Sequence, residues 1–172
     1  GVVGTYSRGS ANQIVKNSDT VCFIGTKTGG MTTHFWNVPE VGIPAIQIDI
    51  DPAEIGRNYP LKASIHADAL TVLEKMLILM DTSTGKNREN WVKECNRIVS
   101  NWYSEFDTLL KSDNVPIRPE RLCSELTNLV PSDSLIVVDT GHAGMWMGGM
   151  FDITSPSQDY IRSAGHLGWA FP

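Results

Sequence analysis

The chain has 172 residues, of which 41% are hydrophobic and 19% are charged, and its formal net charge is -5 at pH 7. This length suits one well-buried domain, or one domain and part of another. The acidic balance argues against nucleic-acid binding, because nucleic-acid-binding domains usually carry a basic surface. No apolar run approaches the length that spans a membrane, and the first ten residues lack the pattern of a signal peptide.

The three cysteines, Cys22, Cys95 and Cys123, are widely spaced and form no Cys-x-x-Cys pair. This spacing predicts neither a zinc site nor a disulfide framework. Cys22 lies in an apolar run, so we interpret it as a small buried hydrophobe. Unpaired cysteines are typical of a reducing compartment, and we therefore expect a cytoplasmic protein.

In chain order, the first predicted element is a helix over 10–17 that begins after Ser10 as its cap. Short buried strands are predicted at 21–25 and 45–50, each followed by a loop. Strands that are this continuously apolar favour a parallel sheet covered by helices on both faces. The predicted fold class is therefore α/β.

A third, edge strand is predicted at 63–68, and Asp68 is positioned to cap the helix that follows it. The apolar residues of this helix recur at helical spacing: Leu70, Leu73, Leu77 and Met80. A polar linker is predicted at 81–88. Its composition gives no periodicity, so the linker separates this helix from the next part of the chain.

The second half of the chain begins with a predicted long helix over 89–111. Its large apolar side chains lie at helical spacing and are interpreted as core and interface packing: Trp91, Ile98, Trp102, Phe106 and Leu109. A further helix is predicted at 117–131, with Pro119 in its first turn. The apolar run of the strand predicted at 134–141 starts a second α/β unit, so we expect a helical connector over 81–117.

Two strand ends in the first unit are candidate ligand sites, because ligands of open parallel sheets gather beyond the carboxyl ends of the strands. The loop that begins with Gly25, Thr26 and Lys27 is rich in glycine, and its backbone amides could receive a phosphate. The alternative is an ordinary loop, because the segment matches neither GxGxxG nor the Walker motif. At the next strand end, Asp49 and Asp51 could accept from a ribose hydroxyl, or Asp51 could simply cap the following turn.

Two glycine-rich stretches of the second unit are further candidates. The segment DTGHAGMW places His142 directly after a strand, in a predicted loop that Gly141 and Gly144 keep open. The segment SAGHLGWAFP holds Leu167 at the tip of a turn between two glycines, which adopt torsions that other residues resist. Leu167 could support a flat ligand there, or it could pack into the core at the start of a helix.

These stretches together resemble thiamine-diphosphate-dependent enzymes of the acetolactate synthase, pyruvate oxidase and benzoylformate decarboxylase group. The segments GVVGTYSRGSANQIVKNSDTVCFIGTKTG and IQIDIDPAEIGRNYP resemble two consecutive stretches of the central domain of that group. The segments VVDTGHAGMW and SAGHLGWAFP resemble the two opening motifs of its diphosphate-binding catalytic domain. The resemblance implies a Rossmann-like central domain at 1–80, a linker helix region at 81–117 and the start of the catalytic domain at 118–172.

The resemblance also implies roles for single residues. Gly141, His142 and Ala143 match the loop that contacts the diphosphate, and Gly165 and His166 match the turn that contacts the aminopyrimidine. Leu167 matches the bulky residue that wedges thiamine into its bent form, which brings the imino nitrogen beside the reactive thiazolium carbon. The adenosine part of FAD binds the central domain in some relatives, and Lys27 stands where the flavin-binding synthases tend to have arginine.

The resemblance implies thiamine diphosphate with magnesium as cofactors, a 2-keto acid as substrate and a homodimer or homotetramer as the complete protein. It places no catalytic residue and no metal ligand in these 172 residues. The activating glutamate belongs to a preceding domain, and the metal ligands belong to a later GDG motif, so we expect an internal segment of a longer enzyme. The alternatives are a stand-alone nucleotide-binding or regulatory module and an inactive homologue.

Overall fold

The computed structural model describes residues 1–80, 87–163 and 165–168. The first unit is built on a parallel sheet of β1 (Val21–Ile24), β2 (Ala45–Asp49) and β3 (Leu61–His66), in that spatial order. The prediction of a parallel α/β fold is confirmed, with the first two strands where the sequence places them. The third strand is at the edge as expected, but it begins and ends two residues earlier than predicted.

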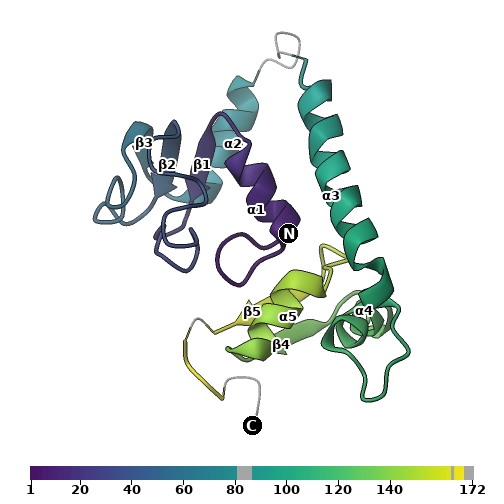
Figure 1. Cartoon of the computed structure of the whole chain (residues 1–172). Helices are drawn as coiled ribbons and strands as arrows, with labels where there is room; N and C mark the ends of the chain where they lie inside the picture. The colour runs from purple at the N-terminus through teal and green to yellow at the C-terminus, as the bar shows by residue number, and fades with distance from the viewer. Residues whose placement is uncertain (81–86, 164, 169–172) are drawn as a thin grey trace.

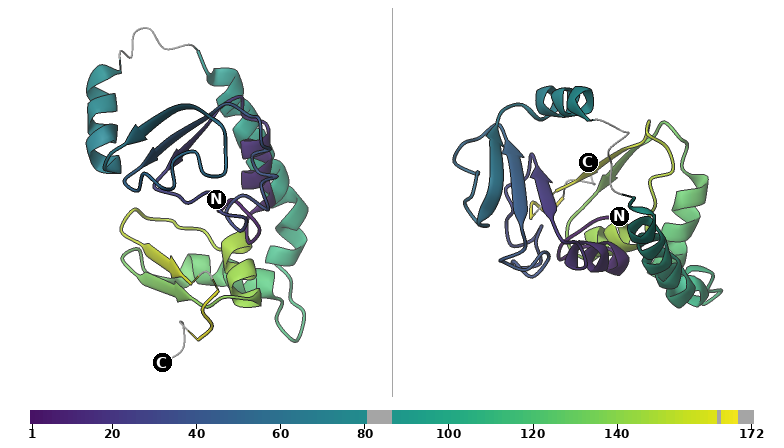
Figure 2. Two further views of the ribbon diagram at one scale, coloured as in Figure 1. Left: turned by 90° about the vertical axis from the view of Figure 1, so that its left-hand side faces the viewer. Right: turned by 90° about the horizontal axis from the view of Figure 1, so that it is seen from above.

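Five helices accompany the strands in the described residues: α1 (Gly9–Lys16), α2 (Ala69–Leu79), α3 (Glu89–Leu110), α4 (Pro119–Leu129) and α5 (His142–Met150). A second, two-stranded parallel sheet consists of β4 (Leu135–Val138) and β5 (Asp159–Arg162). The long helix α3 runs beside α1 and down to α4, so it connects the two sheets along one side of the molecule (Figures 1 and 2). None of the described helices is long and apolar enough to cross a membrane.

The helix starts test the predicted caps. Asp68 caps α2 as expected, since its carboxylate accepts from the backbone N–H of Thr71 at 3.0 Å. The cap predicted at Ser10 is wrong, because α1 begins at Gly9 and Arg8 precedes it without a side-chain cap bond. Ser10 instead lies buried in the first turn. The linker predicted at 81–88 lies mostly outside the described residues.

The core has two centres, one for each unit. In the first, Phe23 of β1 and Tyr59 pack their rings 5.0 Å apart over Ala45. In the second, Trp102 of α3 packs with Cys123, Met150 and the ring of Phe106. Trp102 and Ile98 are both buried, which confirms the interpretation of the apolar stripe of α3 as core packing.

The apolar residues predicted at helical spacing in and just after α2 are largely exposed. Val72 is its buried residue, whereas most of its periodic apolar side chains are exposed: Leu70, Leu73, Leu77 and Met80. Ile24 of β1 and Ile65 of β3 are also partly open to solvent. Cys22 of β1 is exposed as well, so its interpretation as a small buried hydrophobe is wrong. Within the described residues, the first sheet is therefore not evenly covered on both faces.

Two elements of the second unit are absent from the sequence-based prediction. The segment after Gly141 was expected to be a loop, but it forms helix α5, and the segment 159–162 forms β5. Glycine disfavours helices, and α5 contains three glycines, so its propensity gives no helical signal. In β5 the exposed Asp159 and Ile161 alternate with half-buried Tyr160 and Arg162, but the sequence Asp-Tyr-Ile-Arg does not alternate apolar and polar residues, so it gives no period-two signal of a strand.

Cys123 gives a pH-dependent prediction for the second core. Burial, with a contribution from the Glu120 carboxylate, raises the pKa of its thiol from the ordinary 9.0 to about 11. The folded chain thus binds this proton more tightly than the unfolded chain. The resulting stability is complete below pH 9 and is lost as the pH rises through about 11, by about 2–3 kcal/mol in total.

Urea unfolding at pH 8 and pH 10.5 measures this effect. Cys123→Ala is expected to show a smaller fall in the free energy of unfolding between the two pH values than the native chain does. The comparison with this variant is needed because burial also raises the pKa of Tyr59 and Tyr160. Equal falls in both proteins would show that the Cys123 thiol does not contribute to the pH dependence.

Candidate functional site

The carboxyl ends of the first sheet meet at one edge. The strand register pairs Ile24 with Ile48 and Asp49 with His66, so the residues that follow β1 and β2 are neighbours. The backbone N–H of Gly25 donates to the carbonyl of Ile48 at 2.9 Å. Gly25 has a φ of +58°, and a Cβ built on it meets no atom within 4 Å, so a ligand can approach the backbone here.

The glycine-rich loop after β1 is held in place by two side chains from the next strand and loop. The Asn58 amide donates to the carbonyl of Lys27 at 3.0 Å, and the Gln47 amide lies 3.4 Å from the carbonyl of Thr26. The side chain of Lys27 is exposed at the same edge. Gly25, Thr26 and Lys27 therefore form an ordered loop, in which the carbonyls of Thr26 and Lys27 are bonded to the protein.

The two aspartates after β2 already have backbone partners. Asp49 is buried, and its Oδ1 accepts from the N–H of Asp51 at 3.0 Å. The Oδ1 of Asp51 accepts from the N–H of Ala53 at 2.9 Å, which is the turn-capping role offered above as the alternative. The second oxygen of each carboxylate accepts no hydrogen bond from a described residue, so both remain able to accept from a ligand.

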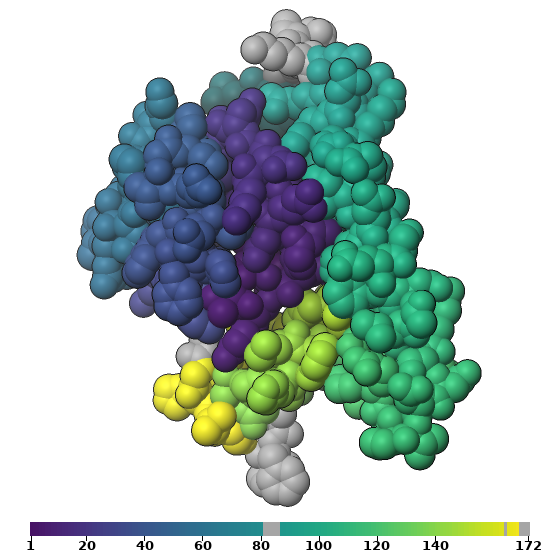
Figure 3. Space-filling view, in the orientation of Figure 1, coloured from purple at the N-terminus to yellow at the C-terminus, as the bar shows by residue number. Residues whose placement is uncertain are grey.

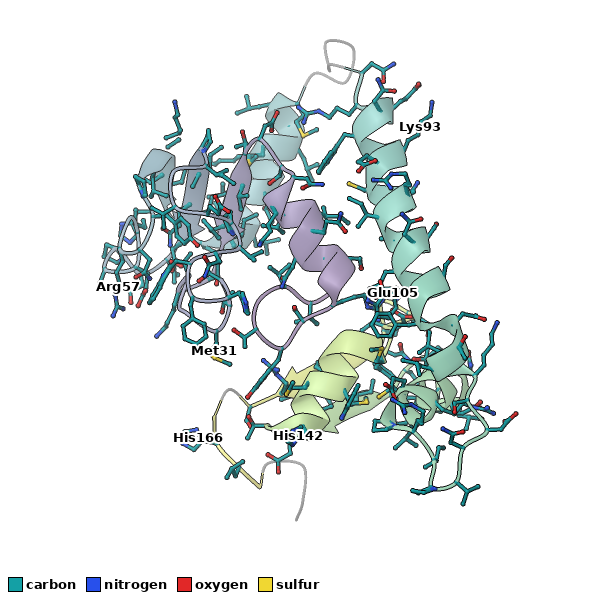
Figure 4. The ribbon with its side chains drawn as sticks, viewed as in Figure 1. Met31, Arg57, Lys93, Glu105, His142 and His166 are labelled. Carbon is teal, nitrogen blue, oxygen red and sulfur yellow. The ribbon has the colours of Figure 1, made fainter. Side chains whose placement is uncertain are left out.

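The second sheet brings the two glycine-rich motifs of the second unit to one edge. Its register pairs Val138 with Arg162, so Asp139 and Ser163 follow their strands side by side. One carboxylate joins the two motifs, because Oδ2 of Asp139 accepts from the N–H of Gly168 at 2.7 Å. Figure 4 shows His142 and His166 at this same end of the molecule.

The first of these motifs forms the start of α5. Gly141 precedes the helix with a φ of +73°, and a Cβ built there meets nothing within 4 Å. No side chain of the described residues caps the helix, so among these residues the backbone N–H groups of its first turn have no capping partner. His142 and Ala143 are exposed in that turn. This geometry suits an anion, because the N–H groups and the helix dipole both favour negative charge.

The second motif forms an open turn. Gly165 and Gly168 have φ values of +113° and +86°, and neither would place a Cβ near another atom. Ser163 fixes the turn, because its hydroxyl donates to the carbonyl of His166 at 2.5 Å. Leu167 is 80% exposed. The alternative that Leu167 packs into the core is therefore wrong in this structure.

Asp139 is the residue of this edge that the sequence analysis did not single out. Its Oδ1 accepts from the N–H of Thr140 at 2.7 Å while Oδ2 holds the other motif. Its place at the end of an apolar strand was the available signal. Among the described residues, no three His, Cys, Asp or Glu side chains are grouped so that they could hold a metal ion.

Residues 1–76 match the family model described as thiamine pyrophosphate enzyme, central domain. The resemblance to the central domain of thiamine-diphosphate-dependent enzymes that the sequence indicated is thus confirmed for this part of the chain. Over its whole length, the chain is similar to a segment of acetolactate synthase large subunits. That similarity covers both glycine-rich motifs of the second unit.

Three relatives illustrate the similarity. The chain is 29% identical to a probable acetolactate synthase large subunit of Methanococcus aeolicus, over 100% of this chain and 31% of the relative. It is 28% identical to the acetolactate synthase large subunit of Haemophilus influenzae, over 100% of this chain and 30% of that protein. For acetolactate synthase 1, chloroplastic, of Zea mays, the identity is 27% over 99% of this chain and 27% of the relative. The chain thus spans less than a third of the length of these relatives.

Proposed function

We propose that the chain is a segment of a thiamine-diphosphate-dependent 2-keto acid decarboxylase or carboligase of the acetolactate synthase type. The observation that supports this most directly is the hydrogen bond from Gly168 to Asp139, which joins the two open glycine motifs at one sheet edge. The similar proteins support the same function, since they are named as acetolactate synthases. A stand-alone nucleotide-binding or regulatory module is not favoured, because it would need neither motif.

The residues present fit a diphosphate and a thiamine ring. The uncapped first turn of α5, with Gly141, His142 and Ala143, offers N–H groups to a diphosphate. The backbone of Gly165 and His166 is open to the aminopyrimidine, and the exposed side chain of Leu167 is free to lie under the rings. A Cβ at position 141 or 165 would fill space that is open here, which is consistent with close approach of a ligand to the backbone.

When bound, thiamine diphosphate would supply a nucleophilic carbon for addition to the keto carbonyl, and a cationic thiazolium ring that accepts the electron pair left behind when carbon dioxide departs. The chain's own part is to bind and orient. The α5 N-terminus would neutralise part of the diphosphate charge, and Asp139 would keep the two motifs at a fixed separation. In this proposal magnesium binds the diphosphate, and the protein ligands of the magnesium lie outside this segment.

The edge of the first sheet is the proposed place for the adenosine part of FAD. Gly25 leaves the backbone open there, and each of Asp49 and Asp51 retains an oxygen for a ribose hydroxyl. Quenching of FAD fluorescence by the complete protein tests this point. The proposal also includes a cytoplasmic homodimer or homotetramer, and the exposed apolar surface of α2 is consistent with burial in an assembly.

The proposed function predicts that the complete protein, with thiamine diphosphate and magnesium, releases carbon dioxide from a 2-keto acid such as pyruvate. The 172-residue chain by itself is expected to release none, because neither the activating glutamate nor the metal ligands of the family motifs are in it. A coupled assay of carbon dioxide, with colorimetric detection of acetolactate, measures both. Release by the chain alone, or failure of the complete protein to bind the cofactor, would contradict the proposal.

A further inference from the structure

Helix α5 needs contacts from outside itself to hold its place. It has nine residues and includes Gly144, Gly148 and Gly149. A helix this short is marginal in water, and each interior glycine costs about 1 kcal/mol relative to alanine. The N-terminus of α5 would receive the diphosphate, so whatever fixes this helix also fixes that part of the site.

The glycine face of α5 lies directly on the N-terminal segment of the first unit. A Cβ built on Gly148 would be 2.9 Å from the carbonyl oxygen of Tyr6, and one on Gly149 would be 3.5 Å from that of Ser7. Figure 3 shows the N-terminal segment, in purple, in contact with α5, in yellow-green. The absence of a side chain at Gly148 is what allows the Tyr6 carbonyl to approach the helix this closely.

Arg8 binds the other end of the same helix. Its Nε donates to the carbonyl of Gly149 at 2.8 Å, and its Nη2 donates to that of Phe151 at 3.1 Å. Its Nη1 forms an ion pair with Asp152 at 2.6 Å. Arg8 is only 7% exposed. Three acceptors at the C-terminal end of α5 therefore converge on one buried guanidinium. Its positive charge is favourable there, because the C-terminus is the negative end of the helix dipole.

Two aromatic residues of α3 hold Arg8 in this position. The guanidinium lies 4.6 Å from the ring centre of Trp102 and 5.7 Å from that of Tyr103. The Tyr103 hydroxyl donates to the other oxygen of Asp152 at 2.6 Å. A forked set of bonds to several acceptors, beside two aromatic rings, suits arginine and not lysine, since a lysine ammonium has neither the fork nor the flat face.

We infer that Arg8 is a positioning residue, through which the first unit fixes helix α5 and hence the diphosphate-binding turn at its far end. This inference rests on the proposed function, because it assigns the α5 N-terminus to the cofactor. The helix transmits the restraint as a rigid rod of about 13 Å. Arg8 touches neither the cofactor nor the substrate in this scheme.

The experiment compares Arg8→Met and Arg8→Lys in the complete protein with the native protein. Arg97→Met is the matched control. Arg97, like Arg8, pairs with a carboxylate, but it lies on the exposed face of α3. Three quantities are measured: the melting temperature without cofactor, the dissociation constant of thiamine diphosphate by calorimetry, and amide hydrogen exchange over 141–150. Both Arg8 variants are expected to weaken cofactor binding about tenfold or more and to speed exchange in α5, whereas the control leaves both unchanged.

A folded Arg8→Met protein with native cofactor affinity would overturn the inference, even if its melting temperature fell, because Arg8 would then be structural only. If Arg8→Met does not fold, the same measurements on Asp152→Asn test the inference instead. This variant removes the charge of the ion-pair partner of Arg8 and keeps the shape of its side chain. Weaker cofactor binding by folded Asp152→Asn supports the inference, and unchanged binding overturns it. Failure of the native protein to bind thiamine diphosphate would instead refute the proposed function, and the exchange measurement would still report whether Arg8 holds α5.

Discussion

Replacing Leu167 with alanine in the complete protein is expected to lower turnover about 100-fold while the melting temperature stays within about 1 °C of the native value. The side chain is 80% exposed in this structure, so its loss creates no cavity in the fold. Its proposed role is to hold bound thiamine in the bent form that brings the reacting atoms together. Steady-state kinetics with saturating cofactor, together with a thermal melt, measures the two quantities.

Leu167→Met is the matched control, because methionine is also bulky and apolar and the family motif admits it. This variant is expected to retain most of the turnover. If Leu167→Ala instead melts at a clearly lower temperature and keeps its activity per folded molecule, then Leu167 is a packing residue in the complete protein. The assignment of the SAGHLG turn to the cofactor would then be refuted.

Gly148→Ala is expected to destabilise the fold by about 1–3 kcal/mol, although alanine is the better helix former. The added Cβ would lie 2.9 Å from the carbonyl oxygen of Tyr6, and a backbone atom cannot move aside as a flexible side chain can. The helix and the N-terminal segment must therefore separate. Urea unfolding measures the loss, and the dissociation constant of thiamine diphosphate is expected to rise with it.

The neighbouring Gly149→Ala provides the control within the same helix. Its Cβ would lie 3.5 Å from the carbonyl oxygen of Ser7, an ordinary contact distance. This variant is expected to be neutral, or more stable by up to about 1 kcal/mol through helix propensity. Equal destabilisation by both substitutions would mean that any side chain on this face is harmful, and equal neutrality would mean that the helix is not pressed against Tyr6.

The sequence predicted those elements whose side-chain pattern is set by their own burial. β1 and β2 are short apolar runs between loops, and α3 has Ile98 and Trp102 at helical spacing, so both kinds of element were found. α5 could not be found this way. Gly148 is required by the close approach of the Tyr6 carbonyl, a contact with a residue more than 100 positions away in the sequence.

The candidate site was predictable to a similar degree. The local pattern placed the motif around His142 at a strand end and Leu167 in a turn between two glycines, and the structure brings both motifs to one edge. Their connection through Asp139 and Gly168 could not be predicted, because it requires β5 to lie parallel to β4. The role of Arg8 was equally hidden, since a lone arginine before a helix is usually a solvated surface residue.

The contact between Arg8 and Asp152 joins positions 144 residues apart, which has a consequence for how the chain is made. During synthesis the first sheet leaves the ribosome and can assemble before the residues that accept hydrogen bonds from Arg8 have been synthesised. Its guanidinium must stay hydrated until Gly149, Phe151 and Asp152 appear, because a buried and unpaired charge is costly. Docking of α5 onto the N-terminal segment is thus a late event that closes a very long loop, and contacts of such sequence separation form slowly.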